Sequence, residues 1–166
     1  RLPVAALADG GAVGLIIGAA IGRIGDVING EHWGRPLDAP WAVVYTHPDT
    51  LGQPGVPVHL AVGYEMVWNL ALFGLLIWMR PRFAGQGLMF WTFVLLYSVG
   101  RFWTSFYRLD AQVLFGLTQA QVVAVVGIVL GIVMLAWMLW LRPRPPVGDP
   151  IDSENTPRSD EVHSPV

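Results

Sequence analysis

Residues 122–141 form an uninterrupted run of twenty amino acids without a single charged side chain. At a rise of about 1.5 Å per residue, a helix of this length spans roughly 30 Å, which matches the hydrocarbon thickness of a bilayer. Only 13% of the 166 residues are charged and 54% are hydrophobic, whereas the surface of a soluble domain needs more charge. The sequence therefore predicts an all-α integral membrane protein.

Four segments have the length and composition of transmembrane helices, and they cover residues 7–28, 59–79, 85–107 and 118–141. The first of them carries glycines at four-residue spacing, which places these glycines along one helix face: Gly10, Gly14, Gly18 and Gly22. Small residues in such a stripe let another helix approach closely. We expect this face to pack within the bundle.

Polar stretches divide the rest of the chain. Residues 34–58 are too polar for a membrane span, and within them "WAVVY" (41–45) predicts a short strand, followed by turns in "HPDTLGQPG". From Pro143 onward Pro, Ser, Asp and Glu dominate without apolar periodicity, which is typical of disorder. We expect a membrane-embedded domain over residues 1–145 and a disordered tail over residues 146–166.

The ten basic residues are all arginines, and their positions predict the orientation of the chain. Arg80 and Arg82 lie in a short loop, and Arg142 and Arg144 follow the last segment, where the positive-inside bias acts. We therefore place these arginines and the C-terminal tail in the cytoplasm and the 34–58 loop outside. Because the chain starts with Arg1 and shows no signal-peptide pattern, we expect it to be part of a longer protein.

Composition also limits the chemistry that this chain can perform. It contains no cysteine, which excludes disulfides, thiolate nucleophiles and cysteine-ligated metals from these residues. Half of the basic residues lie at membrane depth and form no basic patch for nucleic acid. We expect no metal, no other cofactor and no nucleic-acid partner.

Ionisable side chains recur at the predicted outer ends of three segments. Arg101, Ser105 and Arg108 share one helix face with Tyr97 one turn earlier, and Arg23 and Asp26 share a face of the first segment. Such groups at membrane depth are costly unless they are paired or face a wet cavity.

Glu31 lies near the end of the first segment, and Tyr64 and Glu65 open the second. We expect three helices to bring these groups to one level of the membrane, where a phospholipid headgroup is the most available anion. Guanidinium groups hold phosphate with paired donors. The spacing alone leaves three interpretations open: structural ion pairs, a lipid-phosphate site, or a proton or ion path.

The stretch 22–34, "GRIGDVINGEHWG", resembles the signature of bacterial prolipoprotein diacylglyceryl transferases, G-R-x-G-N-F-x-N-x-E-x-x-G. Asp26 and Val27 depart from the signature, in which asparagine and phenylalanine stand. Six positions match it: Gly22, Arg23, Gly25, Asn29, Glu31 and Gly34.

Three further stretches carry the resemblance. The family motif H-P-S-Q-L-Y-E is similar to "HLAVGYE" (59–65), in which His59, Tyr64 and Glu65 match. A family helix bears Tyr, Arg, Glu and Arg in register, and here Ser105 replaces the glutamate between Arg101 and Arg108. "LTQAQ" (117–121) resembles the start of the last family helix. The N-terminal half of the family is missing, with the H-G-G motif whose histidine is considered essential.

The resemblance implies an enzyme of the bacterial cytoplasmic membrane. It would transfer the diacylglyceryl group of phosphatidylglycerol to the lipobox cysteine thiol of a preprolipoprotein signal peptide. A thioether would form and glycerol phosphate would leave. In such a reaction the thiol must lose its proton, and the departing phosphate must be held as its charge develops.

Matching positions carry the implied roles. Arg23 and Arg101 would be catalytic and grip the headgroup, and Glu31 and Tyr97 would be catalytic by orienting these arginines or the headgroup. The remaining members of the implied headgroup site are Arg108, Asp26, Asn29, Gly34, His59 and Glu65.

The departures leave alternatives open. Asp26 adds a carboxylate and Ser105 removes one, so a compensating exchange between two helices is one hypothesis. Another is a degenerate, non-catalytic family member that binds phospholipid without transferring it. A third is a membrane protein with a structural or interaction role.

Overall fold

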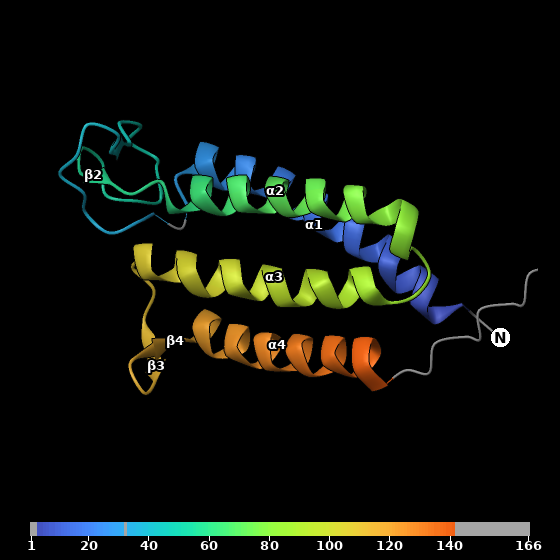
Figure 1. Ribbon diagram of the computed structural model, residues 1–166. Coiled ribbons are helices and arrows are strands. Elements are labelled where there is room, and N and C mark those ends of the chain that lie inside the picture. The colour runs from blue at the N-terminus through green and yellow to red at the C-terminus, as the bar shows by residue number, and fades with distance from the viewer. Residues whose placement is uncertain (1–2, 32, 142–166) are drawn as a thin grey trace, which may run out of the picture.

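The computed structural model describes residues 3–31 and 33–141, and in this part of the chain four α-helices form a bundle (Figure 1). Helix α1 packs against α2 and α3, and α4 packs against the side of α3 that faces away from α2. The helices are α1 (Val4–Asn29), α2 (Ala61–Phe83), α3 (Leu88–Thr104) and α4 (Gln119–Ala136). The 3-10 turn η1 (Ser105–Tyr107) follows α3, and the π-helical turn η2 (Trp137–Leu141) follows α4.

Three helical segments are long and apolar enough to cross a membrane, namely α1, α2 and the stretch Gln119–Trp140. The mostly helical membrane class predicted from the sequence agrees with them. Helix α3 has only 17 residues, so a count of four spans does not follow from helix length alone. The predicted tail, residues 146–166, lies outside the described residues.

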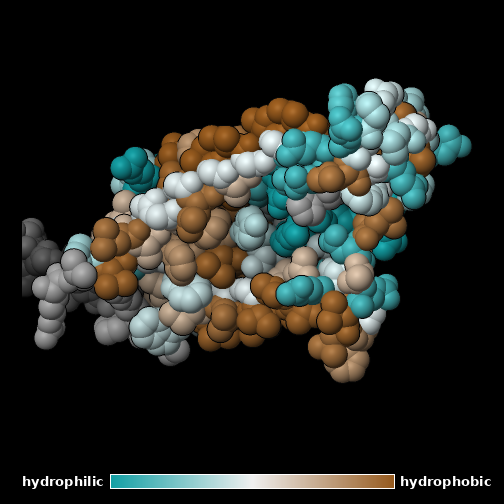
Figure 2. Space-filling model, turned by 180° about the vertical axis from the view of Figure 1, so that it is seen from behind, coloured by the Kyte–Doolittle hydropathy of each residue, from teal (hydrophilic) through white to brown (hydrophobic). Residues whose placement is uncertain are grey.

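Apolar side chains occupy both the interior and the outer surface of the bundle. A core of Ala12, Ile16, Leu72, Leu76 and Met89 joins α1, α2 and α3. Many large apolar side chains on the helices are exposed, which suits a lipid environment rather than water. Figure 2 shows hydrophilic residues gathered toward the end of the molecule that carries the loop.

The glycine stripe of α1 lies on the outside of the bundle. A Cβ added at Gly10, Gly14, Gly18 or Gly22 would meet no atom within 4 Å among the described residues. The expected packing of this face is therefore wrong for the described chain. Helix α1 instead buries Ala12, Ile16 and Ala20, which also recur every four residues but on a different face.

Close helix approach occurs between α3 and α4 instead. A Cβ on Gly127 would collide with the Ser98 hydroxyl, and one on Gly131 would lie 2.7 Å from the Leu95 Cβ. Two glycines one turn apart thus let the α4 backbone contact α3, as small residues do between membrane helices.

Two short hairpins lie at the loop end of the bundle. Where the sequence predicts one strand over 41–45, the structure has β1 (Val43–Val44), which pairs antiparallel with β2 (Pro57–Val58). The second hairpin, β3 (Gln112–Leu114) with β4 (Leu117–Thr118), connects α3 to α4. Both hairpins stand beside the polar ends of the helices.

At the end of the bundle opposite the loop, a carboxylate on α1 caps the start of α3. Asp9 is buried, and its two oxygens accept hydrogen bonds from the backbone N–H groups of Gly87 and Phe90, each at 2.9 Å. The first N–H groups of a helix lack intrahelical partners, and they carry the positive end of the helix dipole. Asp9 therefore caps α3 from another helix, a role that the sequence analysis did not assign.

Candidate functional site

The C-terminal end of α1 carries the first residues of the site. Arg23 Nη1 lies 2.5 Å from Asp26 Oδ2 one turn later on the same helix. The helix ends at Gly30, which has the left-handed φ of +67°, and the N–H of Glu31 donates to the Asp26 carbonyl at 2.9 Å. This glycine cap ends the helix about one turn after Asp26.

Glu65, near the N-terminal end of α2, is the centre of the site. Its side chain is only 5% exposed, and its Oε2 lies 2.6 Å from Arg23 Nη2. Its Oε1 accepts hydrogen bonds from Arg101 Nη1 and, at 3.1 Å, from the Thr104 hydroxyl on α3. One carboxylate therefore joins arginines from two other helices, and Arg23 and Arg101 converge as the sequence analysis expected.

A third arginine, which directly follows η1, approaches the same carboxylate. Arg108 Nη1 lies 3.9 Å from Glu65 Oε1, beyond hydrogen-bond distance. Its Nε and Nη2 donate to Asp110 Oδ2 and Oδ1 at 2.8 and 3.2 Å, a two-pronged pair. We call Arg23, Arg101 and Arg108 with Asp26, Glu65 and Asp110 the arginine cluster, in which three cations face three carboxylates.

The structure also gives Ser105 a partner. Its hydroxyl is buried and donates to the Arg101 carbonyl at 2.7 Å, so it binds helix backbone rather than an arginine side chain. The carboxylate beside Arg108 is Asp110, which the sequence analysis did not select. The only sequence signal for it is its position two residues after Arg108, an arginine that the sequence predicts at membrane depth.

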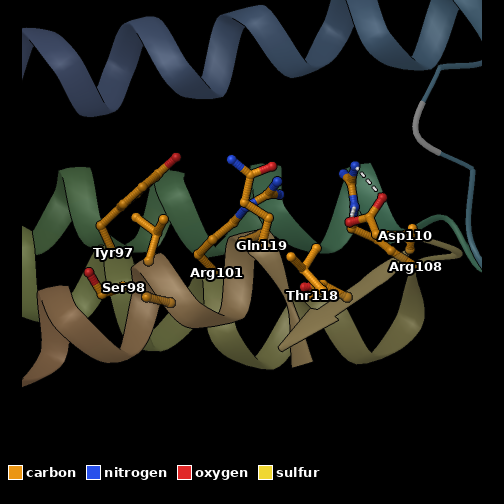
Figure 3. Close-up of a pocket in the computed structure, with 12 residues that line it drawn as sticks. Tyr97, Ser98, Arg101, Arg108, Asp110, Thr118 and Gln119 are labelled. Atoms are coloured by element: carbon orange, nitrogen blue, oxygen red, sulfur yellow. Dashed lines mark hydrogen bonds and ion pairs between the residues drawn. The ribbon is translucent and has the colours of Figure 1, made fainter. Parts of the chain in front are cut away.

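A cavity of about 590 Å³ opens beside the cluster, and we call it the arginine cavity. Figure 3 shows the Tyr97 hydroxyl, the Gln119 amide and the guanidinium groups of Arg101 and Arg108 all directed toward α1. Arg23 reaches the same cluster from α1 through Glu65. Apolar residues such as Val113, Val123 and Ala124 line part of the cavity. Its polar lining residues are Tyr97, Ser98, Arg101, Arg108, Asp110, Thr118 and Gln119.

Helix α4 places Gln119 at the cavity through its first turn. The sequence T-Q-A-Q forms a capping box, in which Gln121 N–H donates to the Thr118 hydroxyl at 3.2 Å. The Gln121 side chain in turn accepts from the Thr118 N–H at 3.0 Å. Because Thr118 and Gln121 are occupied with each other, Gln119 is the amide that faces the cavity, and the sequence analysis missed it.

Two residues of the expected site lie elsewhere. The Asn29 side chain donates to Glu31 Oε1 at 3.2 Å, and both residues line a separate cavity of about 640 Å³ under the loop. Tyr45 and Thr50 also line this loop cavity, and burial raises the pKa of the Tyr45 phenol above its ordinary value of 10.0. The structure joins Asn29 and Glu31 to the loop rather than to the arginines, and their role in headgroup binding stays a prediction.

Gly34 occupies a crowded position beside α2 and η1. A Cβ there would overlap the His59 carbonyl and come within 2.9 Å of the Tyr107 carbonyl. Gly34 also forms an isolated antiparallel bridge with Arg108, and the neighbouring Arg35 Nε donates to the Arg108 carbonyl at 3.2 Å. The structure therefore explains this glycine by close backbone packing that holds Arg108 in place.

His59 belongs to an aromatic group next to the cluster. Its Nδ1 lies 3.3 Å from the Tyr64 hydroxyl, and its ring contacts that of Tyr107 with 5.1 Å between centroids. These rings line an apolar cavity of about 630 Å³ together with Thr104, whose hydroxyl donates to Glu65. His59 therefore lines this apolar cavity and is not among the residues that line the arginine cavity.

A helical bundle with membrane-length apolar helices defines the class, a helical membrane protein with a cluster of paired arginines and carboxylates beside a cavity at one end. Within residues 3–31 and 33–141, no three His, Asp or Glu side chains gather as metal ligands would. Residues 1–137 match the family described as "Prolipoprotein diacylglyceryl transferase", and the chain belongs to this family.

Curated relatives named phosphatidylglycerol--prolipoprotein diacylglyceryl transferase agree with this assignment. The protein of Corynebacterium efficiens is 36% identical over 90% of this chain, and that of Trichormus variabilis is 39% identical over 93%. The protein of Gloeobacter violaceus is 40% identical over 78%. These matches cover 51%, 58% and 50% of the relatives, so the chain spans about half of their length. No solved structure gives a significant match.

Proposed function

We propose that the full-length protein containing this chain transfers the diacylglyceryl group of phosphatidylglycerol to the lipobox cysteine of a preprolipoprotein. Family membership and the names of the relatives support this activity and both substrates. The single observation that carries the proposal is the convergence of Arg23 and Arg101, from two helices, on Glu65 at one end of the bundle.

The geometry fits the departure of a phosphate ester. The deprotonated thiol sulfur attacks the glyceryl carbon, a C–S bond forms, the C–O bond breaks, and glycerol phosphate leaves with the electron pair. Charge develops on the phosphate oxygens, and fixed guanidinium groups stabilise it without having to reorganise. Arg101 and Arg108 border a cavity of about 590 Å³, and Arg23 is fixed beside them through Glu65.

The contacts support the following assignment of roles. Arg23 and Arg101 hold the phosphate, and Arg108 supports them. Glu65 orients both arginines because its two oxygens are divided between them. Tyr97 lines the cavity one turn before Arg101 and contributes its hydroxyl toward the headgroup.

We also propose a topology. The chain crosses the bacterial cytoplasmic membrane four times, with the arginine cluster at the outer side and the C-terminus in the cytoplasm. Support comes from the placement of Arg80 and Arg82 in the last turn of α2, at the end opposite to Glu65. The absence of cysteine from this chain makes an accessibility test direct. In a full-length protein without other reactive cysteines, Gln53→Cys should react with an impermeant maleimide in intact cells and Ala84→Cys should not. The reverse labelling would contradict this orientation.

Transfer itself is tested in vesicles that contain phosphatidylglycerol, the purified full-length protein and a lipobox peptide. The peptide should gain the mass of a diacylglyceryl group, and it should not do so in vesicles of phosphatidylcholine alone. Arg23→Lys keeps the charge and loses the two-pronged donor, so we expect it to lower the rate about tenfold or more. Arg80→Lys, an exposed arginine at the far end of α2, is the matched control.

Two results would redirect the proposal. Equal rates for Arg23→Lys and the wild type would exclude Arg23 as a headgroup clamp. Binding of phosphatidylglycerol without any transfer would favour the non-catalytic phospholipid-binding alternative.

A further inference from the structure

Arg108 is the least accessible arginine of the cluster and the most constrained. Its side chain is 3% exposed, against 17% for Arg23 and 23% for Arg101. Its carbonyl accepts from Arg35 Nε, and its backbone pairs with Gly34 across the loop. A buried cation this tightly held needs a compensating carboxylate.

Asp110 supplies that carboxylate. Its two oxygens take Nε and Nη2 of Arg108 at 2.8 and 3.2 Å, which fixes the plane of the guanidinium group. Nη1 is left buried, and no hydrogen-bond partner for it exists among the described residues. Buried donors are nearly always paired, so an unpaired nitrogen on a cation beside the arginine cavity needs an explanation.

The nearest carboxylate oxygen to this nitrogen is already in use. Glu65 Oε1 accepts from Arg101 and Thr104, and Nη1 stays 3.9 Å away from it. Without the Asp110 pair, the guanidinium could rotate to hydrogen-bond Glu65 and would compete with Arg101 for the same oxygen. In the structure Asp110 takes Nε and Nη2 of Arg108, while Glu65 Oε1 serves Arg101 and Thr104.

We propose that Asp110 is a positioning residue that holds the Arg108 guanidinium group at the wall of the arginine cavity, where Arg108 takes part in binding a phosphate anion. The inference rests on the proposed function of that cavity as a headgroup site, and it adds a residue that neither the signature motif nor the helix pattern indicated. Asp110 acts through Arg108 and does not itself contact the anion, since a carboxylate would repel it.

The test measures binding of phosphatidylglycerol in nanodiscs and of free glycerol phosphate to the purified full-length protein. Asp110→Asn keeps the shape and loses the charge, and we expect it to weaken binding about tenfold, the effect of a lost charge-assisted contact. Asp110→Glu should recover most of the affinity. Asp38→Asn, an exposed loop carboxylate, is the matched control.

A double-mutant cycle separates positioning from folding. In an Arg108→Gln background, Asp110→Asn should have no further effect on binding, because its partner is gone. An equal additional loss in that background would overturn the proposal and indicate that Asp110 acts through the β3–β4 hairpin. If Asp110→Asn does not fold, Arg108→Lys tests the same pair, since lysine cannot form the two-pronged contact, and unchanged affinity would overturn the proposal.

The outcomes also distinguish this inference from the proposed function. A wild-type protein that binds the headgroup but transfers nothing overturns the proposed reaction and leaves the Asp110 variants as a valid test. A wild-type protein that binds neither probe overturns the inference. Binding of glycerol phosphate without phosphatidylglycerol would identify the anion source as the free phosphate.

Discussion

Arg23 on α1 and Glu65 on α2 form an ion pair in which Nη2 lies 2.6 Å from Oε2. The other oxygen of the same carboxylate binds Arg101 on α3, so one buried side chain fixes three helices at the loop end of the bundle. Arginines at membrane depth are tolerated when paired in this way. The Glu65 contacts that join the three helices therefore also set the spacing of Arg23 and Arg101, which we propose to hold a phosphate.

Removing the charge of Glu65 should affect stability and activity together. Glu65→Gln leaves Arg23 and Arg101 without their shared carboxylate, and breaking a buried pair of this kind costs about 3–5 kcal/mol. We expect a large fall in the thermal midpoint of the full-length protein, followed by tryptophan fluorescence, and loss of peptide transfer. Asp38→Asn should change neither, and a Glu65→Gln protein as stable as wild type would show that the pair does not hold the helices.

Gly34 allows a direct choice between a structural and a binding role. Gly34→Ala places a Cβ against the His59 carbonyl, so we expect a lower thermal midpoint because the loop must move away from α2. A contact with the headgroup would instead raise the KM for phosphatidylglycerol while the midpoint stays unchanged. Gly55→Ala is the comparison for adding a methyl group at a loop glycine. No atom among the described residues lies within 4 Å of that Cβ. The φ of +79° at Gly55 adds backbone strain at that residue only.

Helical periodicity and a resemblance in short motifs predict from the sequence alone that Arg23, Arg101 and Glu65 lie at one level of the bundle. This succeeds because the ends of adjacent helices in a bundle lie at one level, so residues at those ends are neighbours. Asp110 and Gln119 escaped because each depends on a local detail, a two-residue step after Arg108 and a capping box at Thr118. Periodicity does not encode such details.

The two glycine patterns also show what spacing in the sequence does not predict. Gly10, Gly14, Gly18 and Gly22 have the spacing of a packing face and lie exposed in the described chain. Gly127 and Gly131 show one such step and carry the close contact between α3 and α4. Spacing identifies a face, but which neighbour covers that face depends on the arrangement of whole helices.

Asp9 should stabilise the far end of the bundle independently of the site. Asp9→Ala removes both acceptors from the start of α3, and we expect a loss of about 1–2 kcal/mol in the free energy of unfolding. Asp9→Asn keeps one acceptor and should lose less. Chemical denaturation in detergent measures both, with Asp49→Ala in the exposed loop as the control, and equal stability of Asp9→Ala and wild type would exclude the cap.

The α3–α4 contact should influence the arginine cavity from a distance. Gly131→Leu forces the two backbones apart, because its side chain meets Leu95, and overpacking of this kind costs about 1–3 kcal/mol. Since the first turn of α4 places Thr118 and Gln119 at the cavity, we also expect a higher KM for phosphatidylglycerol. Gly74→Leu on α2, where a Cβ meets no atom within 4 Å among the described residues, provides the comparison. If Gly131→Leu lowers stability but leaves the KM at the wild-type value, α4 contributes to the bundle without shaping the cavity.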